Sequence, residues 1–479
     1  MLRCLVVAAS TLWCQTNECL KLPRGRVRGL SAINHREVAL RSAVDMKSEG
    51  VNMGYIIRAQ QLLTMPQDAA ELASYGDGGE ERDNSIVGLI EDGCVVVDGE
   101  KIAWVGRWDE RPAKVRRDGV DVFETAVAMP GWIDCHTHAV FAGERSREFA
   151  WRNAGKPYVE ILEEGGGILN TVDAVREASG QALAEELIRR AFLSVRQGVT
   201  TLEVKSGYGL TTADEIKSLK AVQRAQKDVP CELVGCFLGA HAVPREYRER
   251  REAYVELVCE EMIPQVARGG YAAYCDVFCD RGAFSAEEAE RILRCGQEHG
   301  MVARIHADEI TDAGGALVAA KVGASSADHL EFVSQEGIEA MAEAGVVGVL
   351  MPAVNLFLGT IDHLAPARSL LDAGCEVALA TDFNPGSAMT QDLGTILMLG
   401  CTLYKLTPGE ALRSITAGAA KALRREDIGS IRAGARADVA CFDVPHYRYL
   451  TYHFGQTHAE AVIYRGNFVY WTEEADVEE

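Results

Sequence analysis

Hydrophobic positions in the middle of the chain follow two alternating patterns. Eight apolar runs that end in polar residues predict strands, and they lie at 129–138, 198–207, 232–241, 274–281, 301–309, 325–331, 345–352 and 376–384. Between them, apolar residues recur at three- and four-residue spacing over 184–196, 214–227, 286–299 and 338–344, which predicts helices. Strands that alternate with helices indicate parallel β/α units. Eight such units predict an α/β fold, a TIM-like (β/α)8 barrel.

The two ends that flank this barrel have a different pattern. Short runs rich in Val and Ile occupy 54–63 and 93–105, with Asp98-Gly99 as a turn, and a polar stretch over 76–84 predicts a loop. After the barrel, strand-like runs follow at 438–442, 461–464 and 468–471. We expect both chain ends to pair into one small β-sandwich domain. The predicted domains are 51–128 and 429–479 for the two parts of the β domain and 129–428 for the barrel.

Residues 1–50 differ from the rest of the chain. An apolar run over 5–13 precedes an arginine-rich stretch with few acids, as in signal or organelle transit segments. The alternative is a disordered extension, and the apolar run is too short to span a bilayer. We exclude this extension from the fold. The rest of the chain predicts a cytoplasmic protein, and organelle targeting by residues 1–50 stays open.

The charge of the chain limits its partners. The 479 residues carry a formal net charge of −21, which argues against nucleic acid as a partner and against docking on an anionic membrane. A small-molecule substrate is compatible with this charge, but an anionic one needs a specific cation in its pocket. The 14 cysteines contain no C-x-x-C pair and indicate reduced thiols in a cytosol-like compartment. A homodimer is compatible with the composition, and the oligomeric state stays open.

The strongest local signal is the string Pro-Gly-Trp-Ile-Asp-Cys-His-Thr-His, which contains His136 and His138 and ends the first predicted barrel strand. Histidines at i and i+2 of a strand point to the same face, so both imidazoles can reach one cation. Three further candidates end later strands: His306 the fifth, His329 the sixth and Asp382 the eighth. Imidazole and carboxylate groups suit one divalent metal, zinc or iron, and a catalytic site keeps a position open for water. The C-terminal strand ends of a barrel are where such a site is expected.

Longer strings around these residues carry a family resemblance. They are His136-Thr-His138-Ala-Val-Phe-Ala-Gly-Glu-Arg145, Glu164-Gly-Gly-Gly-Ile168, Glu203-Val-Lys-Ser-Gly-Tyr208-Gly-Leu210, Gly239-Ala-His241 and Asp382-Phe-Asn-Pro-Gly-Ser387. With these strings, the chain from about residue 51 onward resembles the amidohydrolase superfamily and, within it, the imidazolonepropionase family. The first fifty residues depart from the family pattern.

The resemblance implies hydrolysis of the cyclic amide of 4-imidazolone-5-propanoate (imidazolone propionate) to N-formimidoyl-L-glutamate, a step of histidine degradation. It implies that His136, His138, His306 and Asp382 hold one metal and that the catalytic acid–base groups are Asp382, His329 and Glu309. Which of these three accepts the proton from water stays open. It also implies a substrate pocket lined by Arg145, Tyr208, His241, Glu309, Asn384, Gly386 and Ser387.

Arg145 matters most for the class of substrate. A bidentate guanidinium suits the carboxylate tail of such a substrate, and Arg145 lies on the loop after the metal-bearing strand. Without the family string, its Glu-Arg-Ser-Arg-Glu setting is typical of a solvated run of charges. Two rival functions stay open. One is another mononuclear amidohydrolase such as a ring deaminase, which needs no carboxylate clamp, and the other is a non-catalytic barrel relative, which would have lost ligands.

Lys205 raises an alternative for the number of metals. In binuclear relatives, a carbamylated lysine on the fourth strand bridges two metals. Lys205 lies on the second predicted strand, and the fourth contains no lysine. A single metal is therefore expected.

Overall fold

Eight parallel strands form a barrel in the computed structural model, which describes residues 54–67, 79–115, 120–156, 160, 166–455 and 458–472. In their hydrogen-bonded order they are β5 (Trp132–Asp134), β6 (Val199–Lys205), β7 (Glu232–Ala240), β8 (Tyr274–Cys279), β9 (Val302–Ala307), β10 (Ser326–His329), β11 (Val347–Leu350) and β12 (Val377–Leu379). The predicted barrel is therefore confirmed. The extension over residues 1–50, positions 164 and 165 of the family strings and 76–78 of the predicted loop lie outside the described residues.

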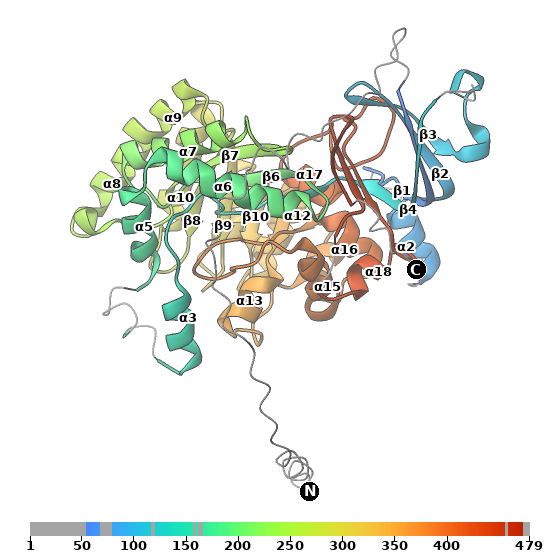
Figure 1. Ribbon diagram of the computed structural model, residues 1–479. Helices are drawn as coiled ribbons and strands as arrows, with labels where there is room; N and C mark the ends of the chain where they lie inside the picture. Colours follow the sequence, from blue (N-terminus) through green and yellow to red (C-terminus); the bar gives the residue numbers. More distant parts are fainter. Residues whose placement is uncertain are drawn as a thin grey trace, which may run out of the picture. The chain divides into compact units, whose positions relative to one another are not determined.

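Helices follow the strands and surround the barrel (Figure 1). The four predicted helices correspond to α6 (Gly180–Val195), α7 (Thr212–Ala225), α10 (Ala286–Glu298) and α12 (Gln335–Ala344). The residues at the start of α10 show why a helix begins at this point. The hydroxyl of Ser285 accepts from the Glu288 backbone and the Glu288 carboxylate accepts from the Ser285 backbone, which is a capping box. Further helices along the described chain are α3 (Ser146–Asn153), α5 (Ile168–Glu177), α8 (Arg251–Leu257), α9 (Ile263–Gly269), α11 (Gly315–Val322), α13 (Pro352–Leu358), α14 (Ala367–Asp372), α15 (Leu393–Tyr404), α16 (Pro408–Ser414), α17 (Ala417–Ala422) and α18 (Tyr449–Tyr452).

The barrel closes where its first and last strands meet. Just beyond β5 and β12, Thr137 forms a parallel bridge with Phe383. The backbone N–H of Asp382 donates to the carbonyl of His136 at 3.1 Å, and that of His138 donates to the carbonyl of Phe383 at 3.1 Å. This closing seam brings segments almost 250 residues apart into register and sets three candidate ligands side by side.

A second sheet combines both ends of the described chain. Its strands run in the order β15 (Asn467–Trp471), β14 (Ala461–Tyr464), β13 (Val439–Phe442), β4 (Val122–Pro130), β1 (Ile56–Leu63), β2 (Leu89–Asp98) and β3 (Lys101–Arg107). The blue N-terminal and red C-terminal strands lie side by side in Figure 1. Strand β13 shows the alternation of a strand buried on both faces: Val439 and Cys441 pack in the core of this sheet, and Ala440 and Phe442 pack in the main core. Both sheets belong to one compact unit, and the domain limits at 128 and 428 stay predictions.

Two sequence predictions about the elements are wrong. The apolar run predicted as one strand over 129–138 contains the end of β4, which belongs to the second sheet, and then β5, which belongs to the barrel. Gly131 separates them, and a side chain there would meet Thr200 at 2.3 Å, so the backbone passes too close for any other residue. The predicted loop over 76–84 contains the first residues of α2 (Glu80–Ile86). The acids in the first turn of α2 complement the helix dipole, which explains why a polar stretch is helical.

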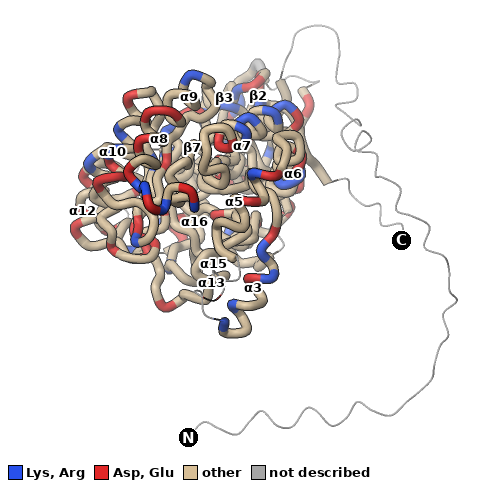
Figure 2. Tube along the Cα trace, turned by 90° about the vertical axis from the view of Figure 1, so that its left-hand side faces the viewer, with Lys and Arg blue, Asp and Glu red and all other residues tan. Residues whose placement is uncertain are grey.

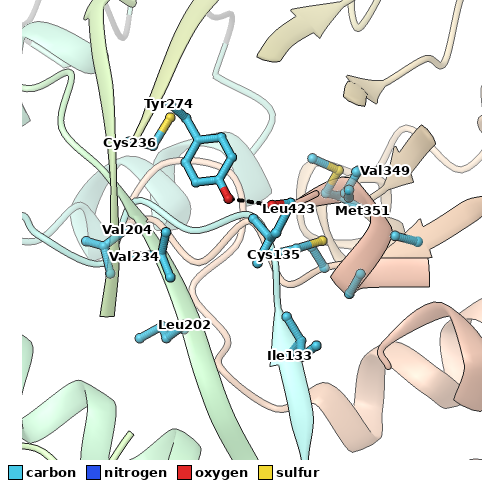
Figure 3. Close-up of a cluster of buried hydrophobic side chains, with 14 of the residues drawn as sticks. Ile133, Cys135, Leu202, Val204, Val234, Cys236, Tyr274, Val349, Met351 and Leu423 are labelled. Atoms are coloured by element: carbon cyan, nitrogen blue, oxygen red, sulfur yellow. Dashed lines mark hydrogen bonds between the residues drawn. The ribbon is translucent and has the colours of Figure 1, made fainter. Parts of the chain in front are cut away.

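The main hydrophobic core contains side chains from the barrel strands and the helices around it. Figure 3 shows a part of it in which Ile133 of β5, Val204 of β6 and Val234 of β7 lie together. The hydroxyl of Tyr274 on β8 donates to the carbonyl of Leu423 at 2.6 Å. The buried hydroxyl of Tyr274 thus has a hydrogen-bond partner, as buried polar groups generally do.

The outer surface carries both signs of charge. Figure 2 shows acidic and basic residues interspersed along α8 and α10. In the part of the chain that the structure describes, no helix is long and apolar enough to cross a membrane.

Candidate active site

The sequence-predicted metal ligands meet at the C-terminal ends of the barrel strands. His136 and His138 follow β5, His306 lies near the end of β9, and Asp382 follows β12. All four side chains are buried, with at most 2% of each residue exposed. His138 Nε2 lies 3.3 Å from Asp382 Oδ1 and 3.3 Å from His306 Nε2, and His136 Nε2 lies 3.5 Å from Asp382 Oδ1. The barrel thus groups His136, His138 and Asp382 as possible ligands of one ion and His136, His306 and His329 as a second, overlapping group, and His306 also meets the first group through His138.

The chemistry of these atoms fits a metal ion. His136 Nε2 and Asp382 Oδ1 are buried and have no hydrogen-bond partner among the described residues. Burial lowers the pKa of His136 and His138 well below the usual range, so both rings are neutral and keep a lone pair. Ligand atoms about 2.0–2.1 Å from a tetrahedral metal lie about 3.3–3.4 Å from one another. The three separations given above, two of 3.3 Å and one of 3.5 Å, are close to that range, so the residues present fit one divalent cation.

Two carboxylates orient the candidate ligands. Asp328 Oδ2 accepts a hydrogen bond from His136 Nδ1 at 2.6 Å, and Asp276 Oδ1 accepts from His306 Nδ1 at 3.2 Å. A carboxylate can only accept here, so the proton of each ring is on Nδ1 and the lone pair on Nε2. Outer carboxylates of this kind fix the tautomer and the orientation of metal-binding imidazoles.

His329 and Glu309 stand beside this group. His329 is 2% exposed, and its Nε2 lies 3.8 Å from Glu309 Oε2. Burial acts to lower the pKa of His329, but Glu309, Glu331 and Asp382 outweigh it and raise that pKa to about 9. Burial also raises the pKa of Glu309 and of Asp382. The site thus holds several groups that can take up or release a proton near the candidate ligands.

The backbone is strained at the same strand ends. Asp308, His329 and Asp382 have positive φ angles of 54°, 83° and 50°, a region that non-glycine residues rarely adopt. Such conformations persist where the surrounding structure requires them, and they cluster at active sites. Asp308 directly follows β9, His329 is the last residue of β10, and Asp382 follows β12.

The turn after Asp382 holds that side chain. The amide nitrogen of Asn384 donates to Asp382 Oδ2 at 2.8 Å, and the hydroxyl of Ser387 donates to the same oxygen at 3.1 Å. Asn384 Oδ1 accepts from the backbone N–H of Gly386 and of Ser387. Asn384 and Ser387 were predicted to line the substrate pocket. That role stays a prediction, and the contacts show that both residues hold Asp382 Oδ2, whereas Oδ1 has no hydrogen-bond partner among the described residues.

Arg145 lies next to the same turn. A side chain at Gly386 would meet Arg145 Nη1 at 2.2 Å, so the glycine makes room for the guanidinium. Arg145 contacts Glu148 Oε2 through Nε at 2.9 Å and through Nη2 at 2.8 Å. Arg145, the predicted cation, therefore lies beside the turn that follows the candidate metal ligand Asp382. Its side chain is 13% exposed.

Tyr208 and His241 pack beside His138. The ring centroid of His138 is 5.8 Å from that of Tyr208 and 5.1 Å from that of His241. His241 Nδ1 donates to the carbonyl of Gly207 at 3.0 Å, and burial lowers the pKa of His241 well below its usual range. A neutral His241 therefore offers Nε2 as a hydrogen-bond acceptor.

Comparison with known proteins shows the family of the chain. An imidazolonepropionase of Shouchella clausii (strain KSM-K16) is 45% identical over 420 residues, which cover 87% of this chain and 92% of that protein. One from Geobacillus sp. (strain WCH70) is 46% identical and covers 80% of this chain and 91% of its own length. The chain belongs to the imidazolonepropionase family. The profile of the wider Amidohydrolase family matches residues 155–470, so the chain is a hydrolase of carbon–nitrogen bonds, and this family implies a divalent metal.

Solved structures show the same fold as this imidazolonepropionase-family chain. An ochratoxinase of A. niger has a TM-score of 0.64 at 18% identity and covers 88% of this chain and 96% of its own. An atrazine chlorohydrolase of Arthrobacter aurescens TC1, complexed with zinc, has a TM-score of 0.61 at 19% identity and covers 87% and 95%. At such identities these structures support the barrel and its second sheet, and the sequence relatives support the family.

Several residues of this family member were missed by sequence reasoning. They are Glu148, which contacts Arg145, the outer carboxylates Asp276 and Asp328, and Glu331, whose pKa burial raises to about 7. Asp276 and Asp328 sit inside apolar strands, and a charge in an apolar run was the available signal. Glu148 gave no signal, because an acid three positions after an arginine is ordinary on a helix surface.

Proposed function

We propose that this chain hydrolyses 4-imidazolone-5-propanoate to N-formimidoyl-L-glutamate in histidine degradation. The observation that carries the proposal is the position of Arg145, a cation beside the turn that follows Asp382. A substrate with a carboxylate tail can reach this guanidinium while its ring lies over the candidate metal ligands. The curated relatives named imidazolonepropionase support the same reaction.

The proposed cofactor is one divalent metal, zinc or iron, held by His136, His138, His306 and Asp382. Such a metal supplies Lewis-acid activation of water and of the ring carbonyl. Three nitrogen ligands and one oxygen ligand are typical of zinc and non-haem iron sites. Lys205 supports a single metal, because its ammonium group pairs with Glu203 and Asp276 at 2.8 Å each and so does not point a free amine at a second ion.

The side chains around the metal position the substrate. We assign the propionate carboxylate to Arg145, and the ring to the space beside Tyr208 and His241. His241 accepts a ring N–H through Nε2, since its Nδ1 proton is held by Gly207. These contacts hold the ring carbonyl next to the activated water, which lowers the barrier by orientation.

Two groups transfer protons in this proposal, and a third orients one of them. The attacking water forms a bond from its oxygen to the ring carbonyl carbon, the π electrons of the C=O bond move to the carbonyl oxygen, and one water proton passes to the carboxylate of Asp382. The ring C–N bond then breaks, its electron pair stays on nitrogen, and His329 delivers a proton there. Glu309, 3.8 Å from His329, keeps that imidazole charged and oriented.

The location of the chain is also a proposal. Every cysteine among the described residues is a free thiol, which supports the cytoplasmic location expected from the sequence.

The decisive experiment is the absorbance decay of imidazolone propionate with purified protein loaded with zinc or iron. We expect turnover with this substrate and at least a hundredfold lower kcat/KM with a 4-imidazolone ring that lacks the propionate. That difference corresponds to about 2.7 kcal/mol, the scale of a shielded, charge-assisted pair. Equal turnover of both rings would instead favour a hydrolase of neutral rings, and no turnover of either would contradict the proposal.

A further inference from the structure

Five charged side chains form a network inside the barrel that the reaction itself does not use. Their exposed fraction is zero, and they come from β6, β8, β9 and β10: Glu203, Lys205, Asp276, Arg304 and Asp328. Lys205 Nζ lies 2.8 Å from Glu203 Oε1, 2.8 Å from Asp276 Oδ2 and 3.9 Å from Asp328 Oδ2. Arg304 Nη2 lies 3.0 Å from Asp328 Oδ2. The ammonium of Lys205 is thus the point at which three carboxylates meet.

The barrel geometry explains how they meet. Glu203 and Lys205 are at i and i+2 of β6, so they point to the same face of the strand. Residues Lys205, Asp276 and Asp328 come from alternate strands β6, β8 and β10, which contribute side chains to a common interior layer in such barrels.

Stability does not account for this network. Buried ion pairs lose so much hydration that apolar residues of the same volume often stabilise a protein more. Here the cost is larger still, because Asp328 Oδ1 and Arg304 Nη1 have no hydrogen-bond partner among the described residues. A set of buried charges that is costly to keep calls for a functional explanation.

Each carboxylate of the network also contacts a segment that carries a candidate metal ligand. Glu203 Oε2 accepts from the backbone N–H of Thr137 at 3.0 Å, between His136 and His138. Asp276 Oδ2 lies 3.1 Å from His306 Nδ1, and Asp328 accepts from His136 Nδ1 at 2.6 Å. Lys205 therefore connects, through one intervening carboxylate each time, to the segments that carry all three imidazole ligands.

We propose that Lys205 is a positioning residue for the metal centre, which through Glu203, Asp276 and Asp328 holds three imidazoles aimed at one ion. The inference rests on the proposed metal site. It adds a role for a lysine that touches neither the ion nor the substrate. Loss of an outer-shell partner of this kind typically weakens metal binding roughly 10- to 100-fold.

Whether Zn²⁺ binds more weakly or more tightly without Lys205 distinguishes a positioning role from simple electrostatics. Lys205→Met keeps the length of the side chain and removes its positive charge. Coulomb attraction alone would then make the site bind Zn²⁺ more tightly, because one repelling charge is gone. Positioning predicts the opposite, since the three carboxylates lose the group that fixes them.

The experiment measures the Kd for Zn²⁺ by competition with a chromophoric chelator, with the fold of the metal-free proteins checked by circular dichroism. We expect Lys205→Met to raise the Kd roughly 10- to 100-fold. The matched control is Lys321→Met, which removes an ion-paired lysine from the outer surface, 2.6 Å from Glu290, and should leave the Kd unchanged. A Kd for Lys205→Met that is unchanged or lower would overturn the inference.

A second variant covers the case in which Lys205→Met does not fold. Asp276→Asn keeps the side-chain shape and leaves the contact between Lys205 and Glu203 in place, yet it no longer fixes His306 as an Nδ1–H donor. It should also weaken Zn²⁺ binding, and an unchanged Kd in this variant would overturn the inference as well. If the parent protein binds Zn²⁺ and turns over its substrate while these variants bind normally, only the inference fails. If the parent binds neither zinc nor iron, the proposed function itself fails.

Discussion

Glu148 holds the guanidinium of Arg145 through a single oxygen. Its Oε2 lies 2.9 Å from Nε and 2.8 Å from Nη2 of Arg145, and the same carboxylate accepts from the backbone N–H of Gly167 and from the amide of Asn170. Both partners are largely buried, so the pair is less screened than a surface ion pair. Arg145 is thereby fixed to the start of α5 with Nη1 left next to Gly386.

Arg145→Met should reduce kcat/KM for imidazolone propionate roughly 30- to 150-fold, since a shielded, charge-assisted pair is worth about 2–3 kcal/mol. The metal content should not change, because Arg145 contacts no candidate ligand. Arg145→Lys should recover only part of the loss, as a point charge cannot reproduce a planar fork. Steady-state kinetics with elemental analysis checks both statements, and a Met variant as active as the parent would remove the main physical support for the substrate.

Part of the loss in Arg145→Met should come from Glu148, which would be left as an unpaired negative charge beside the anionic substrate. The double variant Arg145→Met/Glu148→Gln removes that repulsion. It should recover about fivefold in kcat/KM relative to the single variant, the scale of about 1 kcal/mol between partly screened charges. Identical kinetics of the single and double variants would show that Glu148 does not face the substrate carboxylate.

Gly386→Ala should displace Arg145 without unfolding the protein. A Cβ at this position meets Arg145 Nη1 at 2.2 Å, and that atom is the end of a flexible side chain that can move. Its φ is not in the left-handed region, so alanine is compatible with the backbone. We expect KM to rise roughly tenfold with kcat nearly unchanged, the signature of lost uniform binding. A matched change, Gly180→Ala at the start of α6, where φ is not left-handed and a Cβ would meet Lys217 at an ordinary 3.6 Å, should leave KM unaltered.

The barrel was predictable because each strand is an apolar run that ends in polar residues, and the ligands could be placed because strand ends meet at one face. The split between β4 and β5 was not predictable, since the run is apolar on both sides of Gly131 and only the close approach to Thr200 shows the break. The i,i+3 spacing of Arg145 and Glu148 allows their contact, but the further hydrogen bond from Gly167 to Glu148 depends on how α3 meets the start of α5. No spacing along the chain reports that meeting.

His136→Ala should abolish both the metal and the activity. Its Nε2 is one of the converging atoms, and its loss removes one of four ligands. Elemental analysis of the parent should find about one zinc or iron per chain, and of the variant close to none. Two metals per chain in the parent would contradict a mononuclear site.

Glu309→Gln and His329→Asn should each keep the metal and lower kcat. Glu309→Gln preserves side-chain size, His329→Asn keeps a polar side chain, and each removes the ability to exchange a proton, so we expect a loss of roughly a hundredfold or more, the usual scale of general acid–base help. His329 lies among the candidate ligands, since its ring centroid is 5.2 Å from that of His306 and 5.5 Å from that of His136.

Metal content therefore decides how these two variants are interpreted. If His329→Asn loses metal together with activity, His329 is a ligand and the proton donor must be sought elsewhere, with Glu331 as the next carboxyl group in its electrostatic range. If it keeps the metal and still turns over at the parent rate, the proton reaches the leaving nitrogen by another route. A full metal complement with a hundredfold lower kcat is the combination that the proposed role requires, because only a group that acts on the proton, and not on the ion, produces both results at once.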